Sequence, residues 1–321
     1  MTTQSAHALT LSILFGLLPA CAMDMEDLGS GNYHNGINPE ACDDYLCGTN
    51  TDALVTGYLT LPWLLDAEDP EPDAVHIVSM TRGGISYTPD LVDGALIGRH
   101  LSAPDLAGTN LVGAEFLLQT PTEQVRLRID SVASETSWPE YHPRLYETYT
   151  MSYTNPDVGG SRWLDYCPNA DPAYAVFGEF DEYGIKPSLV FRRMTLACRG
   201  DAVYKMRNMG YDVQEAAPGY QTTDAQRQAT LNMITARYCP GSGAVTVPGT
   251  QYRFQNQAEW FVWEEGLEDA VVEAKWNHSG AVCLNDPRFL SRGTITQICG
   301  PLPYCIDDNQ QPNIEWTSYL P

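Results

Sequence analysis

The chain has 321 residues, of which 43% are hydrophobic, so it holds enough apolar material for a sizeable core and is not a disordered polymer. Its 41 acidic residues outnumber 18 basic ones, which gives a formal charge of -23. Such a surface repels phosphate backbones, which disfavours nucleic-acid binding and suits a soluble extracytoplasmic protein or one that meets cations. High solubility is the simpler explanation of the charge.

Residues 8–20 form an apolar run that is too short to span a bilayer but suits the core of a signal peptide. The run ends in LPAC, which resembles the lipobox of bacterial lipoproteins, where the cysteine, here Cys21, carries the lipid. Cleavage at an A-x-A site for ordinary secretion is the alternative, because basic residues before the core are missing. We expect a signal peptide over residues 1–21. Because Ala22 rather than aspartate follows Cys21, we expect an outer-membrane or cell-surface lipoprotein, with a secreted or periplasmic protein as the alternative.

The next segment predicts a tether that leads into a small loop. Residues 22–46 are rich in Gly, Asn and acidic residues and lack a repeating apolar pattern, as is typical of a flexible linker. Cys42 and Cys47 close together predict a local disulfide loop, since only His34 is near enough to suggest a metal site.

The first half of the folded region predicts strands. Short apolar runs alternate with turn residues from Ala53 to Tyr87. A five-residue repeat follows, and two or three short strands with glycine at their bends explain it better than a pentapeptide solenoid, which needs more coils. Alternating patterns predict half-buried strands over residues 125–130, 145–153 and 189–197. The repeat consists of Leu96, Leu101, Leu106, Leu111 and Phe116.

Two segments predict helices. Residues 201–210 place apolar residues on one face and end at Gly210, and their methionines suit a core better than a ligand groove. Residues 222–239 begin with a capping box of Thr223 and Gln226 and are expected to end at Cys239. Apolar and aromatic residues further along predict more strands.

Removing Cys21 from nine cysteines leaves eight, and an even number in an exported protein predicts four disulfides among 105 possible pairings. Spacing predicts local loops from Cys42 to Cys47 and from Cys299 to Cys305. The remaining cysteines are expected to staple the β-rich body. They are Cys167, Cys198, Cys239 and Cys283. Thiol catalysis is disfavoured, because no cysteine lies in a CxxC motif or beside a histidine.

No motif of nucleophilic or zinc catalysis occurs, since GxSxG and HExxH are missing, and we predict no catalytic residue. The histidines are scattered, and a group of acidic residues suits a solvated face better than a Ca2+ site, the one cofactor considered. The histidines considered are His34, His76, His100, His142 and His278, and the acidic residues are Asp165, Asp171, Glu179, Asp181 and Glu182.

One aromatic segment is a candidate ligand surface. Trp260 and Trp263, followed by Glu264 and Glu265, have the composition of a platform for sugar rings. Packing of Trp260 into the core by alternation is the preferred explanation.

Several segments together resemble one family. ARYC at 236–239, LACRGDAVYKMRNMGY at 196–211 and SGAVCLNDPR at 279–288 are similar to motifs of the ADYC domain, and the resemblance extends from Cys47 to Arg288. It implies an exported bacterial protein whose family has no characterised function, and it supplies no catalytic residues.

This chain departs from the family pattern at three positions. Arg237 stands where the family has aspartate, so no role of that carboxylate carries over. Many relatives have cysteines where this chain has Met206 and Thr230, which implies that those cysteines pair and that one family disulfide is missing here.

We therefore predict an α+β fold with one large β-rich domain, two short helices and disulfide staples. The ADYC-type domain is expected over residues 47–290, followed by a C-terminal disulfide loop and tail over residues 291–321. We expect a non-enzymatic binding or structural module that is held at the membrane by its N-terminal lipid and has an envelope protein or glycan as partner. A secreted hydrolase whose site assembles from distant residues is the alternative.

Overall fold

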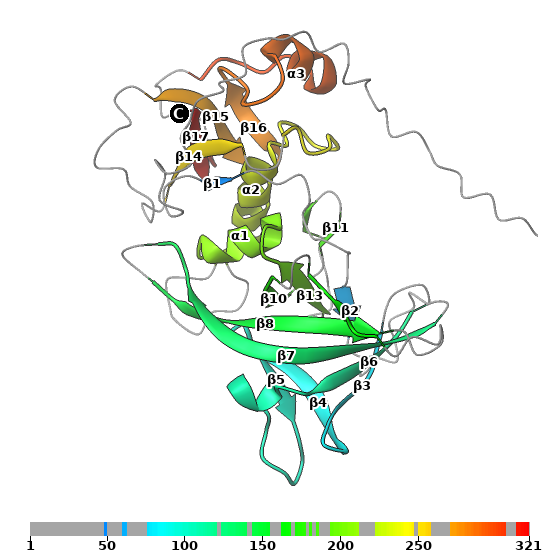
Figure 1. The fold of residues 1–321 in the computed structure, drawn as a ribbon. Coiled ribbons are helices and arrows are strands. Elements are labelled where there is room, and N and C mark those ends of the chain that lie inside the picture. The colour runs from blue at the N-terminus through cyan, green and yellow to red at the C-terminus, as the bar shows by residue number, and fades with distance from the viewer. Residues whose placement is uncertain are drawn as a thin grey trace, which may run out of the picture. The chain divides into compact units, whose positions relative to one another are not determined.

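Figure 1 shows the computed structural model of the chain. All residues that the structure describes belong to one compact unit, Asp43–Pro321, which agrees with a single large domain in this part of the chain. The described residues are 48–49, 60–62, 76–120, 123–139, 143–154, 162–167, 171–177, 180–181, 184–185, 193–211, 222–246, 250–257, 270–305 and 313–320.

The larger of two antiparallel sheets has ten described strands (Figure 1). Its order is β2, β13, β10, β8, β7, β6, β3, β4, β5, with β9 paired to β8. The strands are β2 (Thr60–Pro62), β3 (His76–Arg82), β4 (Ile85–Val92), β5 (Ala95–Arg99), β6 (Glu115–Gln119), β7 (Gln124–Thr136), β8 (Leu145–Thr154), β9 (Leu164–Asp165), β10 (Ala173–Phe177) and β13 (Arg193–Cys198). The predicted strands at 125–130 and 145–153 are therefore confirmed, as is the described part of the one at 189–197.

This sheet curls until its edge strand β5 reaches β8. The Leu96 backbone N–H donates to the Tyr149 hydroxyl at 2.7 Å, and both residues belong to one hydrophobic cluster inside the curl. The five-residue repeat contributes to this cluster without forming a solenoid. Leu96, Leu111 and Phe116 lie in β5, in a 3-10 turn at Gly108–Leu111 and in β6, and Leu106 forms an isolated bridge with Gly98. Leu101 lies outside these elements and is fully exposed, while the other four members are buried.

The second sheet has five described strands in the order β1, β14, β17, β15, β16. The strands are β1 (Gly48–Thr49), β14 (Gln251–Asn256), β15 (Val271–Asn277), β16 (Gly280–Leu284) and β17 (Trp316–Leu320). The prediction of a C-terminal tail is wrong over 316–320, because these residues form β17, which lies between β14 and β15. The Trp316 side chain is fully buried. A separate hairpin pairs β11 (Phe180–Asp181) with β12 (Gly184–Ile185).

Three helices are described, one more than predicted. They are α1 (Ala202–Asn208), α2 (Asp224–Thr235) and α3 (Arg292–Cys299). α1 packs on β10 and β13 of the larger sheet, α2 packs on β15, β16 and β17 of the smaller one, and the two helices pack on each other. Ser291 is the N-cap of α3, and its hydroxyl accepts the Thr294 N–H. Only Ile295 of the helix residues is fully buried, so the sequence shows no apolar stripe that would predict a helix here.

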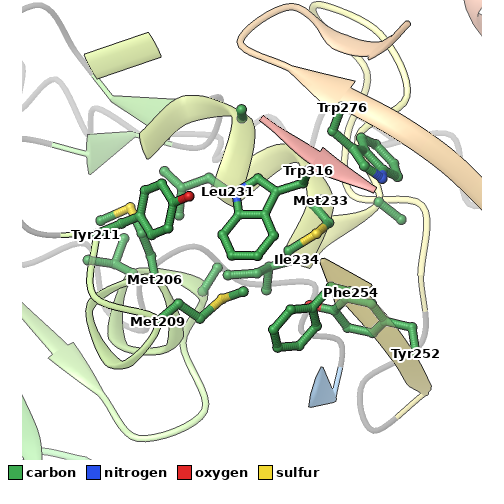
Figure 2. Close-up of a cluster of buried hydrophobic side chains, with 14 of the residues drawn as sticks. Met206, Met209, Tyr211, Leu231, Met233, Ile234, Tyr252, Phe254, Trp276 and Trp316 are labelled. Carbon is green, nitrogen blue, oxygen red and sulfur yellow. The ribbon is translucent and has the colours of Figure 1, made fainter. Parts of the chain in front are cut away.

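The helices and the smaller sheet form most of the main core (Figure 2), to which β8, β10 and β13 of the larger sheet also contribute buried side chains. Met206 of α1 and Met209, the residue that follows α1, meet Leu231 and Ile234 of α2, and Trp316 lies against them from β17. All of these side chains are fully buried, which confirms that the methionines fill the core. None of the described helices is long and apolar enough to cross a membrane.

Candidate functional site

The signature segment ARYC lies directly after α2, which ends four residues earlier than predicted. The capping box is confirmed, with the Thr223 hydroxyl accepting from the Gln226 N–H and the Gln226 side chain accepting from the Thr223 N–H. The helix stops at Thr235 because Ala236 adopts a left-handed conformation with φ 51° and ψ 44°. This conformation is rare for residues other than glycine and turns the chain away from the helix axis.

Tyr238 of the signature joins α2 to the β15–β16 hairpin. Its carbonyl accepts the Ala281 N–H at 3.0 Å, and its hydroxyl donates to Glu273 Oε1 at 2.6 Å. Gly280 makes this approach possible, because a Cβ at that position would lie 2.7 Å from the Tyr238 carbonyl oxygen and φ there is +115°. The motifs ARYC and SGAVCLNDPR are therefore in direct contact in the folded chain.

Glu273 and Arg288 form an ion pair at the centre of this contact. Arg288 Nη2 lies 2.6 Å from Glu273 Oε2, its Nε lies 2.7 and 2.9 Å from the two carboxylate oxygens, and neither side chain is exposed. The guanidinium also lies over the Tyr252 ring, 4.1 Å from its centroid. A buried charge pair of this kind persists only with its partners in place.

The electrostatics of the cluster keep the Tyr238 hydroxyl and the Arg288 guanidinium protonated. Burial raises the pKa of Tyr238 well above its ordinary value, and the neighbouring Glu273 carboxylate adds to the rise. Burial is the largest single influence on Arg288 and opposes its charge, but the Glu273 carboxylate, Tyr238 and Tyr252 together outweigh burial, so the pKa of Arg288 rises. Tyr238 thus remains a neutral donor and Arg288 a cation, which suits structure and not proton transfer at neutral pH.

Two disulfides surround this cluster, and their pairing corrects the predicted local loop. Cys239 bonds to Cys299 and Cys283 bonds to Cys305, so the expected Cys299–Cys305 pair is wrong. The physical reason is α3, which carries Cys299 to the signature segment while the following residues run along β16. The third described disulfide, Cys167–Cys198, confirms two more cysteines as staples of the β-rich body.

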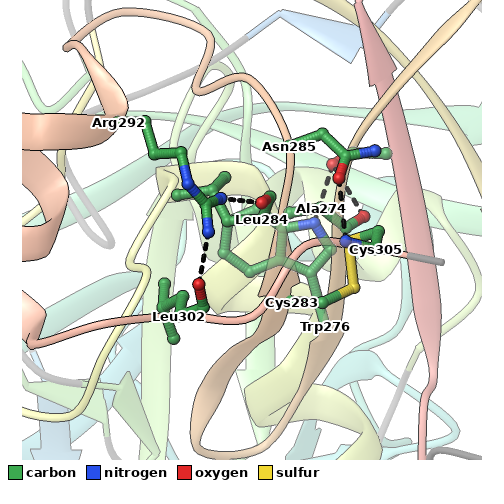
Figure 3. Close-up of a disulfide and its surroundings, with 9 residues drawn as sticks. Ala274, Trp276, Cys283, Leu284, Asn285, Arg292, Leu302 and Cys305 are labelled. Carbon is green, nitrogen blue, oxygen red and sulfur yellow. Dashed lines mark hydrogen bonds between the residues drawn. A yellow bond between two sulfur atoms is a disulfide. The ribbon is translucent and has the colours of Figure 1, made fainter.

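Figure 3 shows how the segment after α3 is held beside the Cys283–Cys305 bond. The Arg292 guanidinium donates to the carbonyl oxygens of Leu284 and Leu302. Asn285 Oδ1 accepts the Cys305 N–H at 2.8 Å. These contacts hold the segment along β16, as the disulfide does.

The positions that depart from the family pattern lie inside the fold. Arg237 is 6% exposed, and its backbone N–H donates to the Asn232 carbonyl at 2.9 Å. Met206 of α1 and Thr230 of α2 are fully buried on two helices that pack together. A disulfide between these helices in relatives is compatible with this arrangement and stays a prediction.

A second polar cluster joins α1 to β7. The Glu135 carboxylate accepts from the Tyr204 hydroxyl at 2.5 Å, from Arg199 at 2.8 Å and from Asn208 at 2.9 Å. Tyr204 stacks on Tyr174 with 4.1 Å between ring centroids, and burial and Glu135 raise its pKa. Because the Glu135 carboxylate of β7 accepts from two residues of α1, this cluster fastens the helix to the sheet.

Several sequence candidates lie outside the described residues. These are the lipidation site Cys21, the loop cysteines Cys42 and Cys47, the ligand-surface residues Trp260 and Trp263 with the neighbouring Glu264 and Glu265, two of the histidines, His34 and His142, and two of the grouped acidic residues, Glu179 and Glu182. Within the described ranges, no group of three or more His, Cys, Asp or Glu is arranged to hold a metal ion.

His100 has a serine and an aspartate close by in sequence, as a catalytic histidine can, but its hydrogen bonds are those of a structural residue. Ser102 and Asp105 follow it closely, yet its Nδ1 accepts the backbone N–H groups of Ser102 and Ala103 at 3.0 and 2.6 Å. Its own backbone N–H donates to Asp105 Oδ1 at 3.1 Å. These residues shape a surface loop.

Sequence reasoning missed a surface feature around Trp163. Arg126 and Arg128 of β7 lie over its indole, with their guanidinium carbons 5.4 and 4.2 Å from the ring centroid. The alternation over residues 125–130 already placed both arginines on one face of the strand. Nothing in the sequence indicated that Trp163 would join them, because it precedes β9, a strand of only two residues without a recognisable alternating pattern.

The comparisons with known proteins agree with the motifs. The family model described as the ADYC domain matches residues 108–290. This range includes α1, α2, the signature segment and the Glu273–Arg288 pair. A search of curated proteins and a search of solved structures found no match.

Proposed function

Since the chain belongs to the ADYC domain family, we propose that it is an exported, lipid-anchored cell-envelope protein whose domain binds an envelope partner without catalysing a reaction. The observation that carries the non-enzymatic part is the complete burial of Glu273 and Arg288 beneath the family signature. These groups bond to each other and to Tyr238, so a substrate in solution does not reach them. The family's motifs then serve the framework, and recognition falls to surface residues.

The disulfides support the location. In the described part of the chain three disulfides link six cysteines, and such bonds persist in oxidising compartments outside the cytoplasm. The apolar run over residues 8–20 and the LPAC sequence that ends it support export and lipid attachment at Cys21. One fatty chain binds membranes only weakly and reversibly, whereas two or more give a stable anchor.

The anchor is tested by labelling cells with radioactive palmitate. We expect the full chain to take up label and to sediment with membranes, and Cys21→Ala to lose the label and enter the soluble extracytoplasmic fraction. Cys42→Ala is the matched control and should keep the label. The variant Gln4→Lys restores a basic residue before the apolar core. If neither the natural chain nor this variant takes up label, the protein is secreted in the ordinary way.

Binding without catalysis is tested by returning purified protein to envelopes from cells that lack it. The full chain carrying Cys21→Ser is used, so that the lipid does not contribute. We expect binding that saturates and is displaced by excess unlabelled protein, with no soluble sugar, peptide or acyl fragments released. Fragments that accumulate with time would instead support the hydrolase, and failure to saturate would contradict a specific partner.

A further inference from the structure

The outer face of β7 carries a cluster that we call the Trp163 platform, made of Trp163, Arg126 and Arg128. Leu127 and Ile129 are buried in the core of the curled sheet, so the arginines that alternate with them project from the opposite face. The arginine side chains are 42% and 33% exposed, and Trp163 is half-buried. An aromatic ring is thus held against the sheet by two cations while part of it meets solvent.

Each arginine of the platform has a carboxylate partner that is itself accessible. Arg126 lies 3.6 Å from Glu115, and Arg128 lies 2.6 Å from Asp130. The carboxylate side chains are 35% and 30% exposed. The platform therefore offers hydrogen-bond donors and acceptors side by side next to an indole, with little surplus charge of either sign.

This combination selects one class of ligand. A sugar ring presents C–H groups that pack on an indole face and hydroxyl groups that both donate and accept hydrogen bonds. A polyanion is disfavoured, because the arginines are already paired and the whole chain carries a charge of -23. We propose that the Trp163 platform binds a neutral glycan chain of the cell envelope, which names the partner class of the binding function proposed above and rests on it.

The proposal is tested by affinity electrophoresis of the full chain carrying Cys21→Ser. The gels contain dextran, laminarin, mannan or xylan as neutral polysaccharides, and alginate and poly-glutamate as acidic polymers. We expect at least one neutral polysaccharide to retard the protein and the acidic polymers to leave it unretarded. Retardation should change less than about twofold between roughly 0.05 and 0.5 M salt, because little charge is neutralised.

The variants assign the binding to the platform. Trp163→Ala should weaken binding roughly tenfold or more, as truncation of a central aromatic contact does, whereas Trp163→Phe should retain most of it. Tyr304→Ala is the matched control, because Tyr304 is also an exposed ring beneath an arginine, with Arg292 3.8 Å from its centroid. It should bind as the natural chain does. If Trp163→Ala does not fold, Asp130→Asn tests the same site by removing one acceptor and should weaken binding several-fold.

Several outcomes would overturn the inference. Retardation by alginate or poly-glutamate alone would assign the platform to an acidic partner. Unchanged glycan binding in folded Trp163→Ala and in Asp130→Asn would place the glycan elsewhere, and no retardation by any neutral polysaccharide would remove the glycan itself. The first two outcomes leave the proposed binding function intact, and after the third the envelope experiment decides that function separately.

Discussion

Replacing Glu273 with glutamine is expected to lower the free energy of unfolding by about 3 to 5 kcal/mol, because the charge of Arg288 is then buried without a counterion. The effect is large because neither side chain of the pair is exposed and both oxygens of the carboxylate are used. The Tyr238 hydroxyl loses a charged acceptor in the same step. Chemical denaturation with urea, followed by tryptophan fluorescence and circular dichroism, measures the change.

An exposed ion pair supplies the control for this experiment. Asp90 pairs with Arg99 at 3.1 Å, and their side chains are 40% and 46% exposed. Asp90→Asn should therefore cost less than about 1 kcal/mol. A loss of similar size in both variants, or a loss below about 1 kcal/mol for Glu273→Gln, would show that the buried pair does not hold the signature segment in place.

Removing the Cys239–Cys299 disulfide by changing both cysteines to alanine is expected to cost about 4 kcal/mol, since the bond closes a long loop in the unfolded chain. The two cysteines are 60 residues apart in sequence. The bond also joins the end of the signature segment to α3, so we expect α3 to unfold first. The free energy of unfolding and hydrogen exchange of the α3 amides measure the two effects.

The neighbouring disulfide is the matched comparison. Cys283 and Cys305 are 22 residues apart, and the chain-entropy account gives about 3 kcal/mol for their removal. The Cys239–Cys299 variant should therefore be the less stable of the two. Peptide mapping without reduction checks the premise, and a peptide in which Cys299 is bonded to Cys305 would contradict it.

The fold was predictable where it depends on neighbours in sequence. The alternation of Val125, Leu127 and Ile129 with polar residues predicted β7, because side chains of a strand point to opposite faces in turn. Helix α3 and strand β17 escaped prediction. The short α3 buries little apolar surface, and β17 follows Pro and Asn residues that are typical of a tail.

The candidate site was predictable only as a set of motifs. ARYC and SGAVCLNDPR were recognised as features of the ADYC domain, but no pattern indicated that Tyr238 and Glu273 share a hydrogen bond or that Arg288 neutralises Glu273. Such contacts join residues far apart in sequence, and Glu273 has no local feature that distinguishes it from the many exposed acidic residues. The Trp163 platform escaped for the same reason, since Trp163 is far in sequence from the two arginines of β7 that it contacts.

The sequence by itself determined the local events: Thr223 and Gln226 begin α2, and the alternation of Val125, Leu127 and Ile129 with polar residues forms β7. Both depend on residues that are neighbours in the sequence, through a capping hydrogen bond in the helix and through the alternating side-chain directions of a strand. The tertiary structure decided which cysteine bonds to Cys239, because only burial of the whole core brings α3 to the end of α2. Spacing within the chain measures how easily a loop closes, whereas the native pairing follows from the packing of segments that the spacing does not describe.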